Sequence, residues 1–128
     1  MNIRSSKHLK VLRHSAGFTL LELLFGIAII GILSAIATQE FNRYRSHSID
    51  AQMRMDLKNA AVAMESYFSE YESYPTTVSG ITAVGFRSTS GVALTIAITT
   101  PSTFTLTANK PAGTQASFTF DSSTGLVN

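Results

Sequence analysis

The sequence predicts an α+β fold, in which one long N-terminal α-helix packs on a small C-terminal antiparallel β-sheet. Three observations predict it: a long apolar run near the N-terminus, an amphipathic stretch that continues it, and alternating segments after Pro75. The 128 residues leave room for one modest domain and an extension. With 14% charged and 45% hydrophobic residues, the composition argues against disorder throughout. There is no cysteine, which excludes disulfides and thiolate metal sites.

The helix is expected to run from about Phe18 to about Tyr74. Its first part, Phe18–Ala37, is almost entirely apolar and would span roughly 30 Å as a helix, enough to cross a bilayer. Its second part repeats apolar residues every three or four positions, at Met53, Leu57, Ala60, Met64, Tyr67 or Phe68, and Tyr71. Charged residues lie mostly off that stripe, at Asp56, Lys58, Glu65, Glu70 and Glu72. No glycine or proline interrupts the chain between Gly31 and Pro75, so the helix is expected to be continuous.

The segment after Pro75 is rich in Thr, Ser, Gly and β-branched residues and predicts an antiparallel sheet over about residues 81–127. Three stretches alternate apolar with small or polar residues: Gly91–Thr99, Thr103–Asn109 and Gln115–Asp121. Ile81–Phe86 is a candidate for a further strand, and Leu126–Val127 for a short last one. The apolar face needs a cover, which the amphipathic half of the helix would supply. The predicted core is Leu57, Met64, Phe68, Leu94, Ile96, Leu106 and Phe118.

The formal net charge of +2 averages two unlike parts of the chain. Four of the ten Lys and Arg precede Gly17 with no acid beside them, at Arg4, Lys7, Lys10 and Arg13. The remainder holds six Lys and Arg against eight Asp and Glu. A nucleic-acid-binding domain would keep its basic excess on the folded part, so no bound nucleic acid is expected. The basic tail is typical of a membrane-orientation signal.

Glu22 is the one charged residue in the apolar run, and three interpretations of this N-terminus compete. Ala35-Ile36-Ala37 has the form of an ordinary secretory cleavage site, but the apolar run is longer than usual and contains an acid. A permanent single-pass anchor would leave Glu22 as an unexplained cost of a few kcal/mol at the bilayer centre. The third interpretation gives Glu22 a function.

That interpretation depends on the stretch "GFTLLELLFGIAIIGILSAIA", Gly17–Ala37, which strongly resembles the N-terminus of type IV prepilins and pseudopilins with their class III signal peptide. It matches their Gly-Phe-Thr-Leu-x-Glu signature followed by the apolar stem. The resemblance implies that a prepilin peptidase cuts between Gly17 and Phe18 and commonly methylates the Phe18 amine. "DLKNAAVAMESYFSEYESYP", Asp56–Pro75, resembles the second half of the pilin helix more loosely. Many pilins have a helix-bending proline where this chain has Gln39.

Glu22 is interpreted, by that resemblance, as an assembly residue whose carboxylate pairs with the Phe18 amine of a neighbouring subunit. Opposite charges in a low dielectric strongly favour pairing over either charge alone. The alternative is that Glu22 lies close enough to the start of the run to reach the lipid headgroups without a partner.

The implied organisation is a cleaved leader over 1–17, a transmembrane and assembly helix over 18–40, and a globular head over 41–128. The implied function is structural: a type IV pilus subunit that forms a homo-oligomeric helical filament. The alternative is a pseudopilin or minor pilin of a type II secretion or DNA-uptake machine. Prepilin peptidase and an inner-membrane assembly platform would be its partners, first in the inner membrane with a cytoplasmic leader and then in an extracellular filament.

Enzymatic activity, cofactors and metals are not expected. His47 and Asp50 lie near several serines, but no nucleophile elbow, phosphate-binding loop or metal-ligand cluster accompanies them. A solvated or inter-subunit polar face is the preferred interpretation of this segment.

Overall fold

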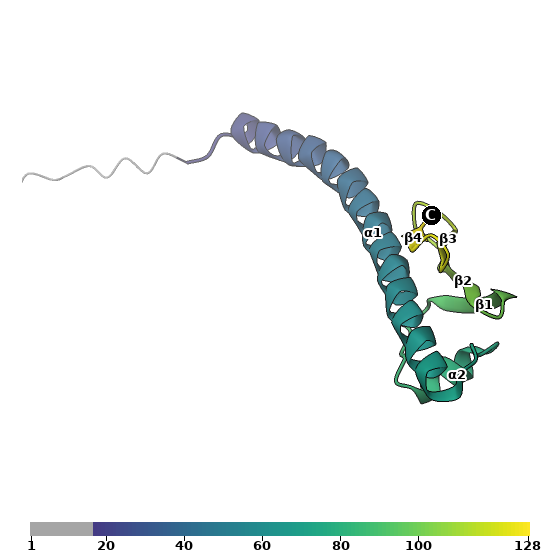
Figure 1. Cartoon of the computed structure of the whole chain (residues 1–128). Coiled ribbons are helices and arrows are strands. Elements are labelled where there is room, and N and C mark those ends of the chain that lie inside the picture. The colour runs from purple at the N-terminus through teal and green to yellow at the C-terminus, as the bar shows by residue number, and fades with distance from the viewer. Residues whose placement is uncertain (1–16) are drawn as a thin grey trace, which may run out of the picture. The chain divides into compact units, whose positions relative to one another are not determined.

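The computed structural model describes residues 17–128, and most of the predicted leader, residues 1–16, therefore lies outside the described part of the chain. The element order is α1 (Leu20–Tyr71), α2 (Val78–Ala83), β1 (Ala93–Thr100), β2 (Thr103–Asn109), β3 (Ser117–Asp121) and β4 (Leu126–Val127) (Figure 1). This confirms the α+β fold. The chain divides into two compact units, which meet between Ala37 and Thr38 inside α1.

Helix α1 is 52 residues long and unbroken, as the absence of glycine and proline beyond Gly31 predicts. It ends three residues earlier than Tyr74, at Tyr71. Glu72 takes the left-handed conformation, with φ 54°, that commonly terminates a helix, and Pro75 follows. The predicted stripe is buried at Met53, Leu57, Ala60 and Met64, whereas Tyr71 at its end is exposed.

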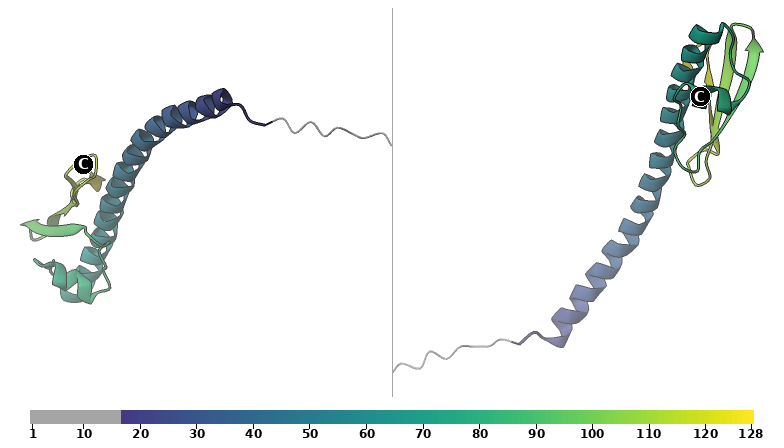
Figure 2. Two further views of the ribbon diagram at one scale, coloured as in Figure 1. Left: turned by 180° about the vertical axis from the view of Figure 1, so that it is seen from behind. Right: turned by 90° about the horizontal axis from the view of Figure 1, so that it is seen from below.

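The sheet has the simple antiparallel order β1-β2-β3-β4 and lies along the second half of α1 (Figure 2). Its register aligns apolar residues on one face: Ile96 pairs with Leu106, and Leu106 with Phe120. Threonines align on the other face in the row Thr95, Thr107 and Thr119. The three alternating stretches and the short Leu126–Val127 strand are therefore confirmed.

The head core lies between α1 and the sheet. Four of the predicted core residues are buried, namely Leu57, Met64, Leu106 and Phe118, while Leu94 and Ile96 are half-buried and pack against them. Phe68 is half-buried and contacts the ring of Tyr74, with centroids 4.6 Å apart. The buried residues that the prediction omitted include Phe104, Ile81 and Phe86.

The prediction of a strand at Ile81–Phe86 is wrong. This segment forms the end of α2, from Val78 to Ala83, and a turn in which Gly85 has φ 103°. Ile81 and Phe86 are both buried, and the Phe86 amide donates to the Ile81 carbonyl at 3.0 Å. A helix followed by a tight turn therefore directs both apolar side chains into the core, as a strand would have done.

Two buried carboxylates on α1 hold loops of the head against the helix. Asp56 accepts the Thr89 amide at 2.7 Å and the Thr89 hydroxyl at 2.8 Å. Asp50 accepts the Thr114 amide at 2.9 Å and also the Thr114 hydroxyl. Asp56 was predicted to lie off the buried stripe and is instead 2% exposed. Hydrogen bonds to charged groups are worth about 1.5–3 kcal/mol each, so these pairs fasten the loops in a chain without disulfides.

Candidate functional site

The segment Gly17–Glu22 contains the residues singled out from the sequence. Gly17 and Phe18 precede the helix, which begins at Leu20 rather than at Phe18, and the Phe18 side chain is 84% exposed. A Cβ at Gly17 would meet nothing within 4 Å. Packing within the described residues therefore gives no reason for a glycine at this position.

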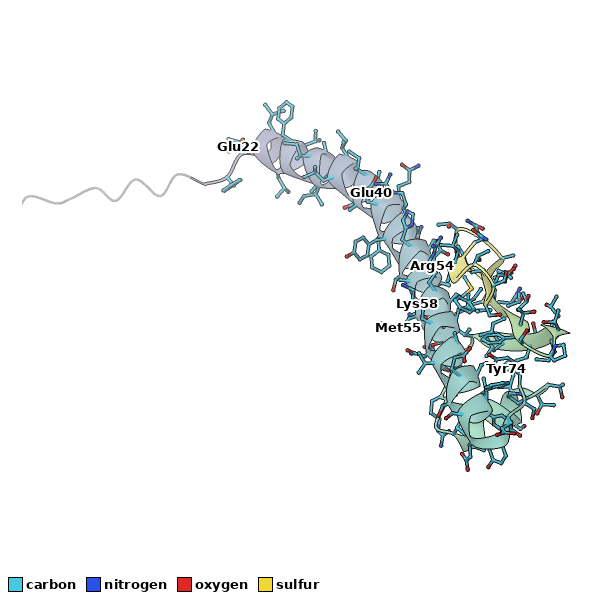
Figure 3. The ribbon with its side chains drawn as sticks, in the orientation of Figure 1. Glu22, Glu40, Arg54, Met55, Lys58 and Tyr74 are labelled. Atoms are coloured by element: carbon cyan, nitrogen blue, oxygen red, sulfur yellow. The ribbon has the colours of Figure 1, made fainter. Side chains whose placement is uncertain are left out.

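Glu22 forms a reciprocal helix cap with Thr19 at the start of α1 (Figure 3). The Thr19 amide and the Thr19 hydroxyl both donate to Glu22 Oε2 at 2.9 Å. In return, the Glu22 amide donates to Thr19 Oγ1 at 3.2 Å. This is a capping box, which satisfies backbone donors that have no partner at the first turn of a helix. Thr19 is thus the N-cap, and this explains why the helix starts at Leu20.

The capping box is a role of Glu22 that the sequence interpretation missed. Its signal is present in the sequence, because Thr19-Leu20-Leu21-Glu22 has the Ser/Thr-x-x-Glu spacing of a capping box before an apolar run. The carboxylate also lies at the positive end of the helix dipole, where an anion is stabilised by about 0.3–1 kcal/mol. Glu22 therefore has a structural function within one chain, whatever it contacts in an assembly.

The apolar part of α1 exposes large hydrophobic side chains on all its sides. Leu23, Ile30 and Leu33, for example, are 62%, 64% and 59% exposed. Among residues 17–128, α1 is the one helix long and apolar enough to cross a membrane, with a mean hydropathy of 2.5 over its most apolar window. A continuous apolar surface of this size requires a lipid or protein cover. Glu22 is the one ionisable residue between Leu20 and Ala37.

His47 and Asp50, considered and set aside as a catalytic pair, have separate surroundings. His47 is exposed, and both Asp50 carboxylate oxygens are hydrogen-bonded to Thr114. Burial raises the pKa of Asp50, but the bonds from Thr114 and the Gln115 amide and the charge of His47 outweigh it, so the pKa lies below its usual value. Across residues 17–128, no three His, Asp or Glu side chains gather where they could hold a metal ion.

Comparison with known proteins places these features in a family. Residues 12–38 match the model of the prokaryotic N-terminal methylation motif. The chain is 43% identical over 58 residues to the type IV major pilin protein PilA of Myxococcus xanthus, a match that covers 45% of this chain and 26% of that protein. It is 30% identical over 104 residues to the type IV wide pilus major component PilA4 of Thermus thermophilus, covering 80% of this chain and 79% of the relative.

The chain belongs to the type IV pilin family. The matched motif of this pilin includes Gly17, Phe18, Thr19 and Glu22, and the match to the Thermus protein extends well beyond the stem. The motif marks substrates of prepilin peptidase, and pilin subunits form filaments. The motif and the apolar helix together fit a membrane-anchored precursor that becomes a pilus subunit.

Proposed function

We propose that this pilin is the structural subunit of a surface filament, cut between Gly17 and Phe18 and polymerised through its N-terminal helix. The observation that carries the proposal is the combination, in the apolar part of α1 (residues 20–37), of exposed hydrophobic side chains with a single carboxylate, Glu22, one turn after Phe18. A lone carboxylate is costly in hydrocarbon, so a countercharge has to reach it. The role is structural, with no catalytic step.

Cleavage would create that countercharge. In the precursor the Phe18 nitrogen is part of a peptide bond, and after the cut it becomes a cationic α-amine. Glu22 pairs with the Phe18 amine of a neighbouring subunit, and methylation leaves the amine cationic. Removing one partner of a buried ion pair costs about 3–5 kcal/mol, because the other charge is left alone.

The topology follows from the charge of the leader. Arg4, Lys7, Lys10 and Arg13 hold the N-terminus on the cytoplasmic side of the inner membrane, where the peptidase cuts, and α1 spans the membrane until the assembly platform extracts it. Both relatives are named as major components, which favours a major pilin over a pseudopilin or minor pilin. A major pilin would dominate surface fibres sheared from cells, whereas a pseudopilin would stay in the envelope.

Mass spectrometry of the mature protein tests the cleavage. We expect Phe18 as the N-terminal residue, carrying a methyl group, and a bulky residue at Gly17 should block the cut and retain the precursor in the membrane. A mature chain that begins at Thr38 would instead mean ordinary secretory cleavage after Ala37 and would overturn the proposal.

The capping box allows the charge of Glu22 to be tested separately from its role at the helix start. Glutamine at N3 of a capping box accepts the same backbone N–H, so Glu22→Gln keeps the helix start and removes the charge, whereas Glu22→Ala removes both. We expect both variants to be inserted and cleaved, and both to fail to form filaments in cells that make no other copy of the chain. Thr19→Ala, which removes the cap but keeps the charge, is the matched control and should still assemble. Normal filaments from Glu22→Gln would show that the charge is not needed.

A further inference from the structure

Strand β1 lies at one edge of the sheet and is the most exposed of the three longer strands. The order β1-β2-β3-β4 leaves one side of β1 without a neighbouring strand, and Ala93, Thr95 and Ala97 are exposed. The strand at the other edge, β4, is only two residues long, whereas β1 has eight. In an edge strand, every second residue points its N–H and C=O groups out of the sheet. β1 therefore presents a row of backbone donors and acceptors.

No other backbone among the described residues pairs with that row. Helix α2 lies beside β1. Among residues 17–128, however, the backbone hydrogen bonds outside the helices and strand pairs include none to residues 93–100. The green hairpin of β1 and β2 also lies further from α1 than the yellow end of the sheet (Figure 2). The open edge is therefore on the side of the head away from α1.

The edge lacks the features that usually keep edge strands apart. β1 contains no charged residue and no proline. Natural sheets commonly protect an edge with lysine, proline, a bulge or a very short strand. β1 does have a bulge, but it falls between Ile98 and Thr100, and residues 93–98 pair regularly with β2. This regular part of β1 is open to an added strand.

The side-chain pattern of β1 makes the strand complementary to itself. Leu94, Ile96 and Ile98 lie on the apolar face of the sheet, and Ile98 is 36% exposed. Two antiparallel copies that cross at Ile96 would place Leu94 of one opposite Ile98 of the other, and Ile96 opposite Ile96. Apolar pairs across neighbouring strands stabilise a sheet, and Ile98 would gain a cover.

We propose that β1 pairs with β1 of a second copy, antiparallel and centred on Ile96, and that this copy belongs to a neighbouring filament. The two four-stranded sheets then join into one. The inference rests on the proposed function, because it needs copies arrayed along a polymer. It concerns the association of finished filaments, and the helix contacts that build each filament are not part of it.

The partner is a second filament because a single pair of heads forms a weak complex. Specific, stable protein complexes bury about 1,200–2,000 Å², which is more than one pair of short strands supplies. A filament repeats the same edge many times, and linked weak contacts gain affinity without any new contact. Because α1 carries the stem that gathers the subunits, the edge away from α1 is the part of the head that another filament can reach.

The test places one lysine on the edge and another at a matched position inside the sheet, in filaments sheared from cells and purified. Ala97 and Thr105 face each other across β1 and β2, so Ala97→Lys and Thr105→Lys add the same charge to the same face. Like charges at an interface weaken association, so we expect Ala97→Lys to lower the filament mass pelleted at low speed about tenfold or more. Thr105→Lys filaments should pellet like the wild type. Thr95→Lys is a second edge variant with the same expectation as Ala97→Lys.

A double variant tests the register of the pairing. Pairing centred on Ile96 puts Ala97 of one copy opposite Thr95 of the other. Thr95→Glu combined with Ala97→Lys therefore places opposite charges across the junction, where such pairs stabilise a sheet. Its low-speed pelleting should return to near the wild-type value. A double variant whose filaments stay apart would overturn the pairing centred on Ile96.

High-speed sedimentation and mass spectrometry separate this inference from the proposed function. Every variant should give the wild-type amount of filament in the high-speed pellet, with Phe18 as the N-terminal residue. Wild-type filaments that remain single, or an equal loss of association in Ala97→Lys and Thr105→Lys, would overturn the edge pairing and leave the proposed function intact. Loss of the filaments themselves in both edge variants would do the same, because it would place β1 in a contact within one filament. A wild-type chain that makes no filaments would overturn the proposed function and the inference with it.

Discussion

At the scale of single residues, the head depends on two acidic side chains whose roles the sequence does not reveal. Asp56 resembles a solvated charge beside an apolar stripe, yet it is buried and binds Thr89, which lies 33 residues further along the chain. Asp50 binds Thr114, at a distance of 64 residues in the sequence. Periodicity reports only on neighbours along a helix, so it cannot identify partners that the fold brings from distant loops.

Removing the Asp56 carboxylate should destabilise the head strongly. In Asp56→Ala the Thr89 amide and hydroxyl lose their acceptor, and an unsatisfied buried donor costs about 1–3 kcal/mol. We expect a loss of about 2–4 kcal/mol in the free energy of unfolding for the pair of bonds, measured by urea denaturation of a soluble head. Asp56→Asn retains one acceptor oxygen and should lose less. Equal stability of Asp56→Ala and the wild type would show that the two bonds contribute nothing.

Asp50 predicts a pH dependence of stability. Its pKa is lower in the folded head than in the unfolded chain, so its stabilising contribution is complete above the unfolded value, near 4, and is lost as the pH falls through the folded value. The melting temperature of the wild-type head should fall between about pH 4 and pH 2. Asp50→Asn should melt lower than the wild type at pH 7, and the difference should shrink towards pH 2. A difference independent of pH would contradict this account.

At the scale of elements, the sequence predicts long periodic segments well and the short segment after α1 poorly. The β2 bounds agree with the expected stretch Thr103–Asn109, because strict alternation of apolar and polar residues over seven positions is typical of a strand with one buried face. Ile81–Phe86 places apolar residues at both helical and strand spacing, so its pattern is ambiguous. Tertiary packing selects the helix for this segment. In α2, Gly80 lies so close to Pro75 that a larger side chain would not fit there.

That close approach makes Gly80 a test of how α2 is positioned. A Cβ at Gly80 would lie 2.5 Å from Pro75 Cβ, so Gly80→Ala should destabilise the head by about 1–3 kcal/mol through overpacking. Alanine favours helix over glycine by ~1 kcal/mol, and α2 would therefore be stabilised by this change if it were free of the contact. Ser79→Ala, at an exposed position of the same helix, is the control and should change stability by less than about 0.5 kcal/mol. A lower melting temperature for Gly80→Ala, with Ser79→Ala near the wild type, would support the clash, and a higher melting temperature for Gly80→Ala would contradict it.

At the scale of the whole molecule, the sequence separates a stem from a head because the two obey different patterns. Apart from Glu22, the stem exposes apolar side chains on all sides from Leu20 to Ala37, while the head alternates buried and exposed residues. The N-terminal signature predicts the family, whereas the capping function of Glu22 rests on the reciprocal hydrogen bonds between Thr19 and Glu22 in the structure. The head carries its own core, with Met53, Leu57, Phe104, Leu106 and Phe118 almost inaccessible to solvent.

Because that core is complete without the stem, a chain beginning at Phe41 should fold alone. We expect it to be soluble and monomeric at micromolar concentration, since the apolar segment that requires a cover is absent. Circular dichroism should show both helix and sheet, and both signals should be lost in one cooperative thermal transition, as is usual for a small single domain. Sedimentation would confirm the monomer. Helical signal without a cooperative melt would mean that the sheet does not pack on α1 unless the stem is present.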